Sequence, residues 1–181
     1  ERSRGLGDVY KRQEQVVFRD YKEKALKKIS DDDSVVTMFT TKDCTPYGMT
    51  GSGSDGLLAC VRKDNQSKVV QYSSTGTVLK EIQYDSQCQP LYQGVWYIAK
   101  NINGDIVVTD FQRKQVTAVN RLGLFRYTYA EEMNAFYPMG VVTDSVGHVI
   151  VANFQGHKID LLDVDGQFLR YIITEGGIRF P

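Results

Sequence analysis

The sequence predicts an all-β protein, and more narrowly a partial β-propeller made of four-stranded antiparallel blades. Two observations support this prediction: short β-runs separated by turns, and a unit that repeats along the chain. Residues 137–171 contain four short runs rich in Val, Ile and Leu, separated by Asp-Ser-Val-Gly, Asn-Phe-Gln-Gly and Asp-Val-Asp-Gly. Apolar runs bounded by such turn sequences are typical of an antiparallel meander.

The same unit recurs with a period of about 45 residues, a length typical of propeller blades. It begins at a proline and contains two turns that end in glycine. The recurring positions are Pro46, Pro90, Pro138 and Pro181, then Gly56, Gly104 and Gly147, then Gly76, Gly123 and Gly166. A single four-stranded sheet of this size cannot bury both faces, so it requires copies of itself as neighbours.

The repeats divide the chain into segments. We expect blades at residues 46–84, 90–129 and 138–172, and the start of a next blade at 176–181. Residues 14–45 lack a clear pattern and are predicted to end with the last strand of a truncated blade. Together these amount to about three and a half blades, which we expect to belong to a six-bladed ring. Because closure of the ring protects the flanking sheets, we expect the chain to be a fragment.

The first residues have a different character. Residues 8–13, DVYKRQ, resemble the translation of an adapter used in sequencing libraries, so we treat residues 1–13 as an artefact. The natural sequence is then expected to begin near Glu14.

Composition limits the function classes. Lys and Arg number 22, as do Asp and Glu, which gives a formal net charge of zero, so charge alone does not favour a nucleic-acid partner. No run is long enough to cross a membrane and no signal-peptide pattern is present. Cys44, Cys60 and Cys88 are odd in number and form no Cys-x-x-Cys pair, which argues against a disulfide framework. We expect a cytoplasmic protein without a membrane partner or a cofactor.

Several motifs of the third blade follow a known repeat. These are Pro-Met-Gly-Val at 138–141, Asp-Ser-Val-Gly at 144–147, the strand at 149–153, Lys-Ile at 158–159 and Asp-Val-Asp-Gly at 163–166. This unit resembles the NHL repeat, and the likeness covers most of the chain from about residue 45. It implies a β-propeller.

The second blade matches the same repeat at 103–104, 106–110 and Lys114. Two departures stand out: Arg62 occupies a position where an acid or amide is expected, and the second blade opens with an insertion after Pro90. The long Tyr-rich repeats resemble the C-terminal propellers of tripartite-motif proteins. That resemblance implies an E3 ubiquitin ligase whose RING finger, B-box and coiled coil would lie outside this chain, with oligomerisation through that coiled coil.

The predicted binding surface is a basic rim. In a propeller, the loops between the second and third strands of all blades lie on one face. In this chain they carry Arg62, Lys63, Arg113, Lys114, His157 and Lys158. Such a rim suits phosphates or an acidic peptide. Alternatively, the basic residues belong to the repeat pattern and pair with a neighbouring acid such as Asp110.

Aromatic residues near these loops leave two interpretations open. Phe111 and Phe154 are candidates for stacking on bases, with Tyr92 close to them in the pattern. Aromatic residues at such positions more often pack between blades.

Catalytic chemistry has weak support in the sequence. Asp110, Asp144 and Asn153 are conceivable metal ligands, but His148 and His157 are the only histidines and no metal-ligand spacing is present. We predict no catalytic residues and no metal site, and therefore no enzyme activity in this fragment.

The sequence thus predicts a non-catalytic recognition module that binds a protein partner or a ubiquitination substrate. RNA binding on the basic rim is the alternative. A metal-dependent propeller hydrolase or lyase is the second alternative.

Overall fold

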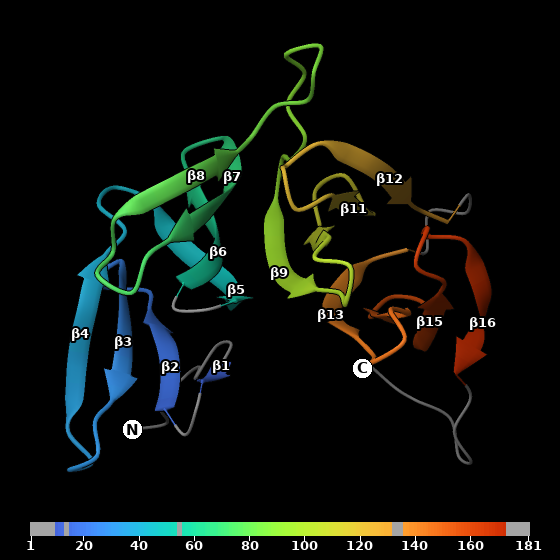
Figure 1. The fold of residues 1–181 in the computed structure, drawn as a ribbon. Coiled ribbons are helices and arrows are strands. Elements are labelled where there is room, and N and C mark those ends of the chain that lie inside the picture. Colours follow the sequence, from blue (N-terminus) through green and yellow to red (C-terminus); the bar gives the residue numbers. More distant parts are fainter. Residues whose placement is uncertain (1–9, 13–14, 54–55, 132–135, 173–181) are drawn as a thin grey trace. The chain divides into compact units, whose positions relative to one another are not determined.

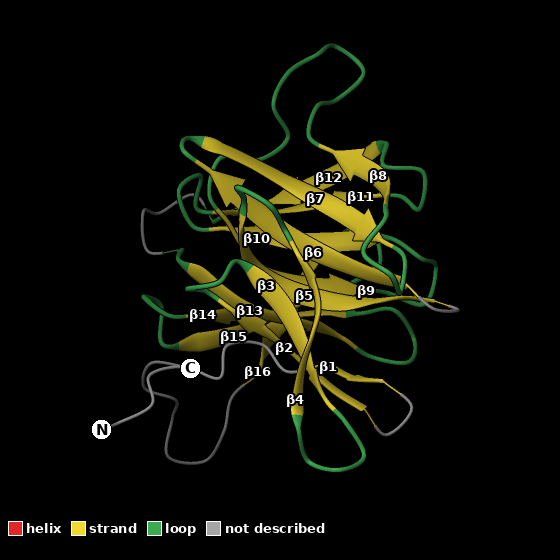
Figure 2. Cartoon of the chain, turned by 90° about the vertical axis from the view of Figure 1, so that its left-hand side faces the viewer, coloured by secondary structure: helices red, strands yellow, loops and turns green. Residues whose placement is uncertain are grey.

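The computed structural model describes residues 10–12, 15–53, 56–131 and 136–172. Within these residues the chain forms sixteen strands, arranged in four sheets of four antiparallel strands, and no helix. Figure 2 shows the strands and the loops that join them. The predicted all-β fold with four-stranded antiparallel blades is therefore confirmed. No helix in the described part is long and apolar enough to cross a membrane.

The chain divides into two compact units, Glu1–Ile82 and Gln83–Pro181, called unit 1 and unit 2. Unit 1 contains two sheets, each formed by strands that follow one another in the chain (Figure 1). Their strands are β1 (Tyr10–Arg12), β2 (Gln15–Asp20), β3 (Ala25–Ile29), β4 (Val35–Thr40), β5 (Thr45–Gly53), β6 (Gly56–Lys63), β7 (Gln66–Tyr72) and β8 (Val78–Ile82).

Unit 2 repeats this arrangement with two further meanders. Their strands are β9 (Val95–Lys100), β10 (Ile106–Asp110), β11 (Gln115–Val119), β12 (Phe125–Tyr129), β13 (Pro138–Thr143), β14 (Val149–Asn153), β15 (Lys158–Leu162) and β16 (Phe168–Ile172). The sheets run β9 to β12 and β13 to β16 in spatial order. The sheets β5–β8, β9–β12 and β13–β16 occupy the places of the three expected blades.

The N-terminal part of the chain differs from the expectation. No structure was assigned to residues 14–30, and residues 31–45 were expected to end with the last strand of a truncated blade; the structure has β2, β3 and β4 in this segment. Strand β1 comes from the segment that we treated as an artefact, and its backbone pairs with β2, Tyr10 opposite Val17. The sheet was missed because basic residues interrupt its apolar pattern, although Leu26 and Val17 are almost fully buried. The expected blade start at 176–181 lies outside the described residues.

Five turns between strands share one hydrogen-bond pattern. In the turn from β15 to β16, the Asp163 carboxylate accepts the backbone N–H groups of Asp165 (2.9 Å) and Gln167 (2.8 Å). Gly166 adopts a left-handed φ of 81°, and a Cβ there would lie 2.2 Å from the Tyr127 ring. The same side-chain pattern is made by Ser73, Asn101, Asn120 and Asp144. This geometry explains the recurring Asp-x-x-Gly motif.

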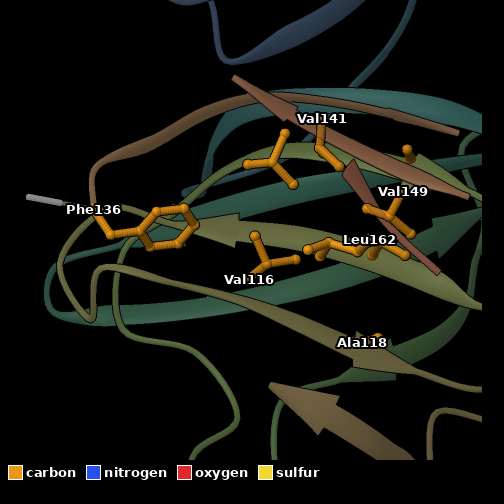
Figure 3. Packing of buried hydrophobic residues seen from close by; sticks show 9 residues of the cluster. Val116, Ala118, Phe136, Val141, Val149 and Leu162 are labelled. Atoms are coloured by element: carbon orange, nitrogen blue, oxygen red, sulfur yellow. The ribbon is translucent and has the colours of Figure 1, made fainter. Parts of the chain in front are cut away.

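Apolar residues between neighbouring sheets form the core. In unit 2 the cluster consists of Ala99, Val107, Val116, Ala118, Phe136, Val141, Val149, Val151 and Leu162. Figure 3 shows Val116 of β11 and Leu162 of β15, which belong to different sheets, turned toward the same space as Phe136 from the segment before β13. Unit 1 has an equivalent cluster of Val17, Leu26, Met49, Leu57, Ala59, Val61, Val70 and Tyr72. Each sheet is therefore held against its neighbour by side chains that are shielded from water.

Truncation of Leu162 tests this core. Leu162 is fully buried, so Leu162→Ala should lower the free energy of unfolding by about 3 kcal/mol, through lost apolar burial and the cavity left behind. Leu169→Ala is the matched control, because Leu169 is 47% exposed on β16 and should cost less than about 0.5 kcal/mol. Urea unfolding monitored by circular dichroism measures both values. Equal losses for the two variants would contradict the described packing.

Candidate functional site

A buried carboxylate organises the end of strand β10. Asp110 is fully buried and accepts four backbone N–H groups through its two oxygens. Gln93 and Gly94 donate at 2.6 and 2.9 Å from the segment before β9, and Gln112 and Arg113 donate at 3.1 and 3.0 Å from the next loop. One side chain thus fixes two loops that are distant in sequence.

Asn153 has the same role at the end of β14. Its side-chain oxygen accepts the N–H groups of Tyr137 and Gly156, both at 3.1 Å. The backbone N–H of Phe154 also bonds to the carbonyl of Tyr137 at 3.0 Å. Asp110 and Asn153, which the sequence offered as conceivable metal ligands, therefore bind backbone groups. Across the described residues, no group of three His, Cys, Asp or Glu side chains is arranged to hold a metal ion.

The fixed loops bring four aromatic rings into a row. Trp96 meets Phe111 edge to face at 5.1 Å between ring centroids. Phe111 lies 6.4 Å from Tyr137, which lies 6.3 Å from Phe154. Phe154 is 39% exposed, and the other three rings are partly buried. We call these four residues the aromatic row; it crosses both sheets of unit 2 where their second strands end.

The basic candidates of unit 2 have two kinds of environment. Arg113 donates to the backbone carbonyls of Leu91 (3.0 Å) and Pro90 (2.8 Å), so its guanidinium supports the segment before β9. Lys114 and His157 end their loops with a left-handed φ of 52° and are exposed. Both therefore lie at the surface, beside Phe111 and Phe154 in the chain.

Lys158 belongs to a polar cluster that sequence analysis missed. Its ammonium pairs with Glu131 at 2.7 Å and lies 4.1 Å from the centre of the Tyr171 ring. The Tyr171 hydroxyl donates to the same carboxylate at 3.3 Å. Nearby, the buried Asp160 accepts the Tyr129 hydroxyl at 3.2 Å, and its other oxygen has no hydrogen-bond partner. The sequence offers one signal for this cluster, an acid at an inward-facing position of an apolar strand.

Burial raises the pKa values of two groups in this cluster. Desolvation, followed by the negative charge of Glu131, raises the pKa of Asp160 to about 6. Desolvation also raises the pKa of Tyr129, with the Asp160 charge as the next cause. The cluster therefore holds a carboxyl group that changes its charge not far below neutral pH.

Arg62 and Lys63 lie in unit 1, apart from the other four candidates in the chain. They form the end of strand β6, and only Asp64 and Asn65 connect it to β7. Arg62 stacks over the Tyr47 ring at 5.0 Å, and Lys63 pairs with Asp43 at 3.0 Å. The register places buried Val61, not Arg62, opposite Pro46 and Lys68, where the last sheet has Asn153 opposite Pro138 and Lys158. The sheet β5–β8 therefore has an apolar side chain where unit 2 has an acid or amide. A basic rim shared by both units stays a prediction.

Substitution of Asp110 tests its role in fixing the loops. Asp110→Ala should reduce the free energy of unfolding by about 3 kcal/mol, because buried N–H groups lose their acceptor. Asp110→Asn should retain most of the stability, since Asn153 fills the equivalent place in the next sheet. Chemical denaturation measures both, and equal losses for the two variants would contradict this role.

The Asp160 cluster predicts a pH dependence. The folded pKa, about 6, exceeds the ordinary value of 3.8, so the folded state binds the proton more tightly than the unfolded state. Asp160 contributes about 3 kcal/mol to the free energy of unfolding when it is protonated. This contribution is fully present below about pH 4 and is lost as pH rises to about 6. Asp160→Asn should remove this loss. The free energies of unfolding of both proteins are measured by urea titration from pH 4.5 to 7.5 in steps of about half a unit. The two curves should converge toward low pH. Parallel curves would contradict the prediction.

Comparison with known proteins shows the fold. A virginiamycin B lyase from Staphylococcus aureus with quinupristin aligns at a TM-score of 0.72 and 16% identity, covering 95% of this chain and 58% of that one. A nidogen/laminin complex aligns at 0.75 and 9% identity, covering 94% and 64%. A calcium-binding regucalcin from Agrobacterium tumefaciens aligns at 0.66 and 12% identity, covering 90% and 58%. The chain thus spans less than two thirds of the length of these structures.

These comparisons correct one prediction and leave another without support. Solved structures with this fold include two enzymes, virginiamycin B lyase and a streptogramin B lyase. The prediction of no enzyme activity, which was made from the lack of metal-ligand spacing in the sequence, is therefore wrong. No protein-family model and no curated protein sequence matches the chain, and the tripartite-motif relationship stays a prediction from sequence. At these identities the likeness shows the fold alone, and that fold is a β-propeller.

Proposed function

We propose that this chain is part of a β-propeller recognition module whose unit 2 binds a protein partner through the aromatic row. The observation that supports this proposal is the continuity of the row across two sheets, with Phe154 at its exposed end. Partly exposed aromatic side chains offer large contact areas at low entropic cost and are enriched in protein interfaces. Lys114 and His157 add polar groups beside the rings.

The chemistry of the surface favours protein over RNA. The formal net charge of the chain is zero, and Arg113 and Lys158 are engaged by groups of unit 2 itself. The rings of the row contact one another edge-on or tilted, with interplanar angles of 89°, 49° and 58°, so they do not form parallel platforms for successive bases. The partner we propose is therefore a segment with apolar and acidic side chains.

The repeats suggest a biological setting for this binding. Their resemblance to tripartite-motif propellers supports a ubiquitination substrate as the partner and the cytoplasm as the location. The support for this part of the proposal comes from the sequence motifs.

A selection experiment tests the proposed surface. Random peptides displayed on phage and selected on the complete chain should bind it, and Phe154→Ala should weaken that binding by about tenfold or more, because an exposed anchor ring is lost. Phe125→Ala is the matched control, since Phe125 is 50% exposed on β12, away from the row. Binding is measured by fluorescence polarisation.

Three outcomes would contradict the proposal. Peptides that bind equally well to Phe154→Ala would exclude the row, and equal loss with Phe125→Ala would indicate a general surface effect. The third outcome is binding of homopolymeric RNA that weakens steeply with salt and falls in Lys114→Asn. Asn tolerates the left-handed backbone at this position, so that variant removes the charge without straining the loop.

A further inference from the structure

Unit 1 contains an open cavity of about 270 Å³. It is lined by residues 40–44, which join the two sheets of the unit, and by side chains from strands β6, β7 and β8. The volume is close to the lower end of the range for small-molecule sites, about 300 Å³. The cavity belongs to unit 1, whereas the aromatic row belongs to unit 2.

Unit 2 has larger side chains at two of the equivalent positions on its outer strand. Strands β7 and β8 pair in the same register as β15 and β16, including the bulge beside the turn. In this register Val78 and Glu81 of β8 stand where β16 has Phe168 and Tyr171. Both Val78 and Glu81 line the cavity. Two aromatic side chains of unit 2 thus stand at the register positions of two residues that line the cavity.

One of these rings, that of Tyr171, also covers a cation in unit 2. Phe168 and Tyr171 lie 4.8 Å apart, and Tyr171 lies over the Lys158 ammonium at 4.1 Å. Lys68 has the register position of Lys158 and lines the cavity, but its ammonium pairs with the carboxylate of Glu81, at 2.7 Å. Unit 1 thus retains the lysine while the ring that covers its counterpart is replaced by a shorter side chain.

The charge of the cavity favours an anion. Lys42, Lys63 and Lys68 line it together with two acids, Asp43 and Glu81, which leaves one positive charge in excess. Lys63 pairs with Asp43 at 3.0 Å, and Lys68 pairs with Glu81. Each ammonium carries three N–H donors, so a ligand carboxylate can join these pairs without breaking them.

Part of the remaining wall is apolar, beside Thr40 and Thr41. Val70 and Tyr72 are buried, and Val78 is 45% exposed at the opening. Burial raises the pKa of Tyr72 to about 12, so its hydroxyl stays neutral at physiological pH. An aromatic ring placed here would bury its faces against these side chains.

We propose that this cavity binds a small aromatic carboxylate. The ring of the ligand packs against Val78, on the strand where unit 2 has Phe168 and Tyr171. Its carboxylate lies between Lys63 and Lys68. This site is independent of the proposed protein-binding surface.

The cysteines of the chain report binding directly. Cys44 lines the cavity and is partly exposed, whereas Cys88 is exposed in unit 2 and Cys60 is buried. In the complete chain, 3-phenylpropionate should slow alkylation of Cys44 by iodoacetamide about tenfold at saturation, with a dissociation constant of about 1 mM. Alkylation of Cys88 should not change. Peptide mass spectrometry measures both rates.

Ligand charge provides the first control. Phenethylamine, which carries the same ring on a cation, and the neutral 3-phenylpropan-1-ol should protect Cys44 much less. Lys68→Met keeps most of the side-chain volume and should weaken protection by 3-phenylpropionate several-fold. Equal protection by the amine, or no protection by the carboxylate, would overturn the proposal.

Filling the cavity provides the second control. The double variant Val78→Phe, Glu81→Tyr copies unit 2 and should abolish the effect of 3-phenylpropionate on Cys44, while thermal unfolding shows that the fold is retained. The comparison uses the ratio of rates with and without ligand, because the new rings also shield the thiol. Protection that persists in this folded variant would place the ligand elsewhere and overturn the proposal. Should the double variant not fold, the charge series and Lys68→Met decide the question.

Discussion

The fold depends on apolar contact between the faces of neighbouring four-stranded sheets. A sheet of this size has two faces, and in unit 2 Val107 of one sheet and Val149 of the next are fully buried in a single cluster. Because protein interiors are close-packed, this contact determines how neighbouring sheets stack. The packing also fixes the positions of the loops at the sheet ends, because these loops begin and end on strands that cannot shift without opening the core.

The turns convert this stacking into a defined surface. The Asp-x-x-Gly turns bind their own backbone, which keeps them tight. Asp110 and Asn153 instead bind the segment that precedes their own sheet, so each ties the start of a meander to its middle. The rings of Phe111 and Phe154 follow these residues directly in the chain. The aromatic row is therefore a consequence of two buried polar residues, each stabilised by satisfied hydrogen bonds.

The sequence could predict what local patterns control. Four-stranded meanders, Gly turns and the blades after residue 45 were visible because strand period and turn chemistry act over a few residues. The sheet that begins at Tyr10 was not, because its strands carry basic residues and its buried positions are few. Arg62 and Lys63 were assigned to a loop from the repeat register, but a two-residue connection places them on β6. The Asp160 cluster and the unit 1 cavity depend on side chains brought together from separate strands, which no local pattern encodes.

The two units show where a repeat protein has freedom to change. The second strands of the later sheets are mostly buried, as Val107 and Val149 illustrate, and there a change of volume costs stability. The fourth strands are far more exposed, including Leu79 at 58% and Leu169 at 47%. Substitution at such positions usually changes stability little. The exchange of Phe168 and Tyr171 for Val78 and Glu81 falls on these outer strands, so it opens a cavity without removing the contacts that hold the sheets together. Differences in binding between repeats of one fold are expected to arise where the core does not constrain the sequence.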